Sequence, residues 1–146
     1  MTSLTDVKDK VQRYLTARFG SILVDPQGDY SFCVGATRIF VRVRPWAKSR
    51  TAVSIFAPLL VDVPLTQELK DYVALEGDHF PFGRMGLRVN DESGDSALLL
   101  FSYAIFGDYL DEEELANACL AVALVVDERT AELKRRFGGR CPGEDD

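Results

Sequence analysis

Residues 30–57 read YSFCVGATRIFVRVRPWAKSRTAVSIFA, and this stretch decides the fold. Apolar residues occupy every second position, as in Ile39, Val41 and Val43, which is the period of a half-buried β-strand. The links between the alternating runs are short, and Pro45 ends the second run because it lacks the N–H group that a strand ladder needs. We therefore predict three consecutive antiparallel strands in this stretch.

Helical periodicity precedes and follows these strands. Residues 3–19 place apolar side chains at helical spacing, and Gly20 follows them at the position where a helix commonly ends. The last helix is expected to follow Asp111, because three glutamates stand in its first turn and basic residues near its far end, as the helix dipole favours. Between these two helices the pattern predicts a short helix at 65–76 and strands at about 84–90 and 97–105.

The resulting order is α-β-β-β-α-β-β-α, which predicts an α+β fold. Its expected architecture is an antiparallel five-stranded sheet with the helices packed on one face. We expect a single domain over residues 1–139 and a disordered tail over residues 140–146, which are charged and lack apolar anchors.

Composition narrows the class of function. The net charge of -6 argues against nucleic-acid binding, which needs clustered cations. No apolar run approaches the roughly 20 residues that span a bilayer, and the first ten residues lack the apolar core of a signal peptide, so we expect no membrane association. Three cysteines without CxxC spacing fit a reducing compartment, and we therefore predict a cytoplasmic location.

The sequence offers little material for catalysis. There is one histidine, His79, and neither Cys33 nor Cys119 has an activating neighbour in sequence. The acidic residues Asp108 and Asp111 lack the spacing of a calcium loop. We therefore predict no metal, no cofactor and no enzymatic activity, although chemistry at Cys33 or at the acidic loop stays open as an alternative.

One face of the predicted sheet combines arginine with aromatic residues. If Ile39, Val41 and Val43 face the helices, the alternate residues must point to the other side. Arginine with aromatic side chains is typical of binding surfaces, while an ordinary solvated sheet face is the competing interpretation. The candidate partner-binding residues are Phe40, Arg42, Arg44, Trp46, Phe56 and Arg88.

Residues 98–105 and 118–126 carry more apolar side chains than a strand or helix with one wet side needs. The first helix could cover the excess, or a second copy of the chain could. We favour a homodimer, because symmetric dimers are the commonest oligomers.

Four segments resemble a known family: VSIFAP at 53–58, GRMGL at 83–87, LLLFS at 98–102 and LDEEEL at 110–115. With the element order, they make residues 3–137 similar to the YbjN-like branch of the type III secretion chaperone-like superfamily, small bacterial proteins. The resemblance implies a non-enzymatic, dimeric chaperone or adaptor whose sheet holds an extended segment of a client protein or peptide.

A different function also remains open at this point. A small-molecule-sensing regulatory domain would have a pocket between the sheet and the helices, near Tyr72, Phe80, Phe82 and Tyr103.

Overall fold

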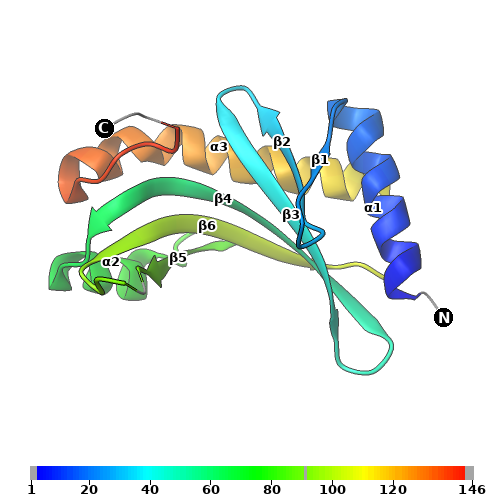
Figure 1. Cartoon of the computed structure of the whole chain (residues 1–146), viewed down its shortest axis with the longest axis horizontal. Coiled ribbons are helices and arrows are strands. Elements are labelled where there is room, and N and C mark those ends of the chain that lie inside the picture. Colours follow the sequence, from blue (N-terminus) through cyan, green and yellow to red (C-terminus); the bar gives the residue numbers. More distant parts are fainter. Residues whose placement is uncertain (1–2, 91, 144–146) are drawn as a thin grey trace.

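A computed structural model of the chain describes residues 3–90 and 92–143 (Figure 1). Within these residues the chain forms three helices and six strands. In chain order they are α1 (Leu4–Phe19), β1 (Leu23–Val24), β2 (Tyr30–Val34), β3 (Thr37–Trp46), β4 (Arg50–Pro64), α2 (Gln67–Glu76), β5 (Arg84–Val89), β6 (Ser96–Phe106) and α3 (Glu112–Phe137).

The strands form one sheet in the order β1-β2-β3-β4-β6-β5, and every neighbouring pair is antiparallel. The predicted α+β class with an antiparallel sheet is thus confirmed. The predicted number of strands was one too few, because β1 pairs with Tyr30 and Ser31 at the edge of the sheet. With only two residues, both exposed, β1 has no alternation by which the sequence could reveal it.

Strand β4 continues well past Ala57, where its alternating pattern was expected to end, and it includes Pro58. Proline is tolerated there because β3 pairs with β4 only as far as Phe56, so the missing N–H falls where no neighbouring strand needs it. Further along this open edge, Val61 exchanges two main-chain hydrogen bonds with Arg140. The expected tail therefore begins with a residue bound to the sheet, and its last three residues lie outside those described.

Helices α1 and α3 lie against one face of the sheet, here called the inner face (Figure 1). The side chains of Ile39, Val41 and Ile55 on this face are fully buried. Helix α2 packs near the far end of α3, where the rings of Tyr72 and Phe137 lie 5.2 Å apart. Among the described residues, no helix packs against the opposite face, here called the outer face.

The apolar segment of α3 is largely covered within one subunit. Most of its residues from Ala118 to Val126 are buried against the sheet and α1. This is the result expected if the first helix, rather than a second copy of the chain, covers them. Leu120 and Leu124, one turn apart, stay 46% and 57% exposed. In the described part of the chain, no helix is both long enough and apolar enough to cross a membrane.

Candidate functional site

The strand register brings the predicted outer-face residues together. Phe40 on β3 pairs with Phe56 on β4, and Phe56 pairs in turn with Ser102 on β6. Two residues further along β3, Arg42 pairs with Ser54 on β4. Because side chains alternate between faces, these partners all point to the face opposite α1 and α3.

At the centre of this face is a cluster of two aromatic rings and two guanidinium groups, here called the Phe56 cluster. The rings of Phe40 and Phe56 are stacked with their centroids 5.4 Å apart. The guanidinium carbons of Arg42 and Arg88 lie 5.3 Å and 5.8 Å from the Phe56 ring centroid. An aromatic ring attracts cations to its face, so Phe56 holds two arginines from different strands in one place.

Asp29 fixes the position of Arg42. The Asp29 carboxylate is 5% exposed and accepts hydrogen bonds from Arg42 Nε at 2.9 Å and from Nη2 at 2.6 Å. The hydrogen bond from Arg42 lowers the pKa of Asp29, and the same bond raises the pKa of Arg42. The backbone N–H of Asp29 is itself held by Asp25 Oδ1 at 2.9 Å. Asp29 was not among the predicted site residues, although it stands directly before β2.

Arg44 and Arg88 are two cations of this face that remain available. Both side chains are exposed, and neither has an ion-pair partner among residues 3–90 and 92–143. Arg42, by contrast, is already committed to Asp29. Arg44 and Arg88 are therefore available to an acidic ligand, and exposed Arg84, which pairs with Ser102, adds a further cation on the same face.

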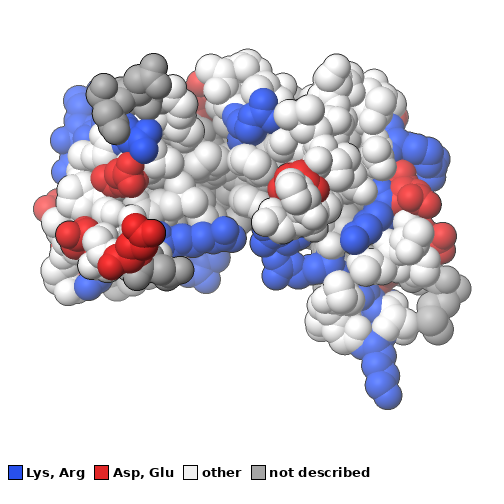
Figure 2. All heavy atoms as spheres, in the orientation of Figure 1, with Lys and Arg blue, Asp and Glu red and all other residues white. Residues whose placement is uncertain are grey.

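The outer face is hollowed between these arginines. The groove has a volume of about 230 Å³. Gly86 contributes no side chain to the groove, and a Cβ added there would lie 3.9 Å from Leu100 Cδ1. Figure 2 shows Lys and Arg side chains gathered along the concave underside of the molecule, between the β3–β4 hairpin and the end that carries α2. The groove is lined by Arg42, Arg44, Ser54, Phe56, Gly86, Leu87, Arg88, Leu100 and Ser102.

Five of the six predicted residues thus meet at one place, while Trp46 lies apart. Trp46 stands at the end of β3, on the same face, and its ring centroid is 5.8 Å from that of Phe106. It is 47% exposed and Phe106 is 66% exposed. The prediction missed Leu100 and Gly86 in the groove, because strand β6 is apolar on both faces and a glycine carries no signal of its own.

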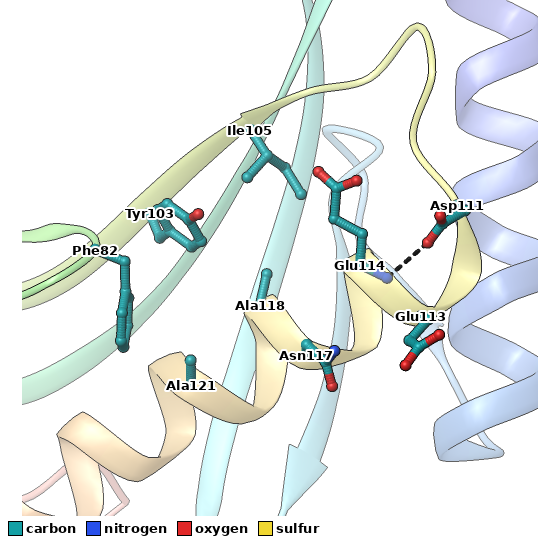
Figure 3. A pocket seen from close by; sticks show the side chains of 9 residues that line it. All are labelled: Phe82, Tyr103, Ile105, Asp111, Glu113, Glu114, Asn117, Ala118 and Ala121. Atoms are coloured by element: carbon teal, nitrogen blue, oxygen red, sulfur yellow. Dashed lines mark hydrogen bonds between the residues drawn. The ribbon is translucent and has the colours of Figure 1, made fainter.

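A second hollow of about 480 Å³ lies between β6 and the first half of α3 (Figure 3). Phe82 and Tyr103 line it, as expected for a sensing pocket, but Tyr72 and Phe80 do not. Tyr72 packs on the ring of Phe137, and Phe80 packs on the ring of Phe101. The four aromatic residues therefore do not form one pocket.

Cys119, Asp108 and Asp111 have structural roles, whereas Cys33 is exposed on β2. Burial raises the pKa of the Cys119 thiol to about 12, so it is not a nucleophile at neutral pH. Asp108 accepts a hydrogen bond from Thr51, and Asp111 accepts one from the backbone of Glu114 and caps α3. Among the described residues, no group of three or more His, Cys, Asp and Glu side chains is placed to hold a metal ion.

Comparison with known proteins gives one family. The model of T3SS (YopN, CesT) and YbjN peptide-binding chaperone 1, TY-Chap1, matches residues 5–145. No curated protein matches the chain.

Three solved structures share the fold. YbjN from E. coli, described as a putative transcription regulator, is 10% identical with a TM-score of 0.62, covering 94% of this chain and 97% of its own. A chain of the ExsC–ExsE complex is 14% identical with a TM-score of 0.59, covering 90% and 96%. A chain of the HopA1–SchA chaperone–effector complex is 12% identical with a TM-score of 0.55, covering 90% and 99%. The resemblance seen in the sequence is confirmed.

Proposed function

Because the chain belongs to the TY-Chap1 family of peptide-binding chaperones, which is non-enzymatic, we propose that it binds an extended segment of a partner protein across the outer face of its sheet. The observation that carries this proposal is the groove at the Phe56 cluster. It combines an apolar floor with exposed cations, and no element of the described chain covers it.

The residues that line the groove indicate which side chains the partner segment should carry. Phe56 and Leu100 offer apolar contact to one or two side chains of the partner. Arg44 and Arg88 offer charge-assisted hydrogen bonds, which are about twice as strong as neutral ones. We therefore expect an apolar residue flanked by aspartate or glutamate. From β3 to β5 the face spans three strand spacings, or roughly 14 Å, which about four extended residues would cross.

The proposal is tested with variants that change charge without touching the core. We would reverse the two exposed cations of the groove in Arg44→Glu/Arg88→Glu. The matched control is Lys70→Glu/Arg135→Glu, which makes the same charge change on exposed positions of α2 and α3. Tagged proteins would capture partners from the host at low salt, and quantitative mass spectrometry would compare the recovered sets.

The groove variant should lose its partners and the control should retain them. A labelled peptide alternating Glu and Val provides a defined probe in fluorescence anisotropy, and it should bind the control at least about tenfold more tightly than the groove variant. Equal recovery by the two variants, or equal affinity for the peptide, would refute the outer face as the site.

We also propose that the chain forms a homodimer through α3. Leu120 and Leu124 support this proposal, because they form an exposed apolar pair on the side of α3 that points away from the sheet. Sedimentation velocity at tens of micromolar should give a dimer for the wild type and a monomer for Leu120→Asp/Leu124→Asp. A wild type that sediments as a monomer would exclude the dimer while leaving the groove proposal intact.

A reducing, cytoplasmic setting is part of the same proposal. Cys33 and Cys119 form no disulfide in the structure, and Cys119 is fully buried. Thiol titration of protein isolated under alkylating conditions should find all three reduced, whereas a mixed or intermolecular disulfide would contradict this setting.

A further inference from the structure

The groove of the outer face holds more positive charge than the described chain neutralises. Three arginines line it, and Asp29 neutralises one of them, Arg42, in an ion pair at 2.6 Å. Arg44 and Arg88 keep their charges, because neither forms an ion pair within residues 3–90 and 92–143. A ligand that compensates both of them carries more than one negative charge.

The strands around the groove supply no acid that could compete for these two arginines. Strands β3, β5 and β6 contain no Asp or Glu. In β4 the one acidic residue is Asp62, which forms an ion pair with Arg140 at 2.6 Å. Arg84, exposed on β5 and paired with Ser102, adds another cation beside the groove. The exposed positive charge is therefore available to a ligand.

The groove also has more hydrogen-bond donors than a carboxylate can use. Arg42 directs Nε and Nη2 to Asp29, and its other terminal nitrogen, Nη1, has no partner in the described chain. Ser54 and Ser102 line the groove with hydroxyl groups that bind no other described residue. A carboxylate has two oxygens, whereas a phosphate monoester has three acceptor oxygens and a charge of about -1.5 to -2 at pH 7. Both the charge and the donors therefore favour a phosphate.

Two of the arginines are held in place before a ligand binds. Asp29 fixes Arg42, and the ring of Phe56 holds the guanidinium groups of Arg42 and Arg88 at 5.3 Å and 5.8 Å from its centroid. Side chains that are already ordered lose less entropy on binding. Leu100 lies beside them in the same groove and offers an apolar contact. The groove is therefore suited to a phosphate that stands next to an apolar side chain.

We propose that the groove at the Phe56 cluster binds a phosphoserine or phosphothreonine of the partner segment, next to an apolar residue that contacts Leu100. The phosphate oxygens accept hydrogen bonds from Arg44, Arg88 and Nη1 of Arg42. Phosphorylation of the partner would then control its capture. This inference rests on the proposed function, because it names the chemistry of the segment that the same groove would bind.

The test compares three labelled eight-residue peptides that alternate Ser and Val and differ at one central position. That position is serine, phosphoserine or glutamate, and fluorescence anisotropy measures the affinity of each peptide. We expect the phosphoserine peptide to bind at least about tenfold more tightly than the serine peptide. It should bind at least about threefold more tightly than the glutamate peptide, because it has more charge and one more acceptor oxygen.

The pH dependence distinguishes the phosphate from a carboxylate. The second pKa of phosphoserine is about 6, so the phosphate changes from dianion to monoanion between pH 7.5 and 5. The arginines of the groove keep their charges over this range, and so does Asp29, because its pKa is lowered by Arg42. Over the same range the affinity for the phosphoserine peptide should fall by at least about threefold. The affinity for the glutamate peptide should stay within about twofold.

Two sets of variants test the assigned donors. Arg44→Lys/Arg88→Lys keeps the charge but removes the planar fork that matches phosphate, so the preference for phosphoserine over glutamate should fall by at least about threefold. Ser54→Ala/Ser102→Ala should also reduce this preference by at least about threefold. The control Lys70→Glu/Arg135→Glu should leave the preference unchanged, and circular dichroism verifies that every variant is folded.

Four results would overturn the inference. The phosphoserine and serine peptides could bind equally, or the preference could be unchanged in folded Arg44→Lys/Arg88→Lys. An eight-residue thymidine oligonucleotide could bind as tightly as the phosphoserine peptide, which would assign the groove to nucleic acid. Inorganic phosphate could do the same, which would assign it to the free ion.

The Glu–Val peptide keeps this inference separate from the proposed function. If that peptide binds at the groove and phosphoserine gives no advantage, the phosphate inference alone fails. If neither the Glu–Val peptide nor the phosphoserine peptide binds, the outer face is refuted as the site and the inference fails with it.

Discussion

Replacing Asp29 with asparagine removes the charge that holds Arg42 while preserving the shape of the side chain. In the wild type, the almost fully buried carboxylate accepts three hydrogen bonds from Arg42, at 2.9, 3.0 and 2.6 Å. Hydrogen bonds to charged groups contribute about 1.5–3 kcal/mol, and breaking a buried pair costs up to about 5 kcal/mol. The Arg42 side chain stays 30% exposed, so water can replace part of the loss.

We therefore expect Asp29→Asn to lower the free energy of unfolding by about 2 kcal/mol at pH 7, or the Tm by about 4–8 °C. Urea unfolding at pH 7, 5 and 3 measures the effect. Because Arg42 depresses the pKa of Asp29 in the folded state, the wild type keeps this stability above the unfolded-state pKa of about 3.8 and loses it as pH falls through the folded-state value. The difference between the proteins should persist from pH 7 to 5 and shrink at pH 3. A difference below about 0.5 kcal/mol at pH 7, or one that is unchanged at pH 3, would refute this reasoning.

Two further substitution and labelling results are expected. Gly83→Ala should lower the free energy of unfolding, measured in urea, by about 2 kcal/mol or more. The new methyl group would lie 2.6 Å from the Ser102 carbonyl oxygen, at a residue with positive φ. A loss under about 0.5 kcal/mol would show that the approach to β5 can relax. Exposed Cys33 should react with a thiol reagent within minutes at pH 8. Cys119 should react only on unfolding, because burial raises the pKa of its thiol to about 12. Rapid labelling of Cys119 in the folded protein would contradict its burial.

Strand alternation was enough to predict the outer face. The period of two at Ile39, Val41 and Val43 assigned Phe40 and Arg42 to the opposite side, and the cross-strand register then placed Phe56 beside them. This succeeds because a strand has only two faces, so that knowledge of the buried one determines the other.

Long-range partners could not be predicted in the same way. The ion pair between Asp29 and Arg42 depends on how the turn before β2 meets β3, and no periodic pattern encodes that contact. The pairing of β5 with β6 ends at Ser102, next to a close approach of Gly83 to the Ser102 carbonyl that no sequence pattern reveals. The dimer was inferred from an apolar excess that α1 and the sheet largely cover, and within the described segment 118–126 its support is the exposed pair Leu120 and Leu124.

The most direct test of the central claim is to map where the partner's segment lies on the folded chain. An ¹⁵N-labelled sample would be titrated with the segment identified by capture, and amide shifts would be followed by NMR. Binding at the groove predicts the largest shifts at Ser54, Phe56, Gly86, Arg88 and Leu100, with the exposed side of α3 unchanged. Shifts confined to the helices, with the outer face of the sheet silent, would contradict the account.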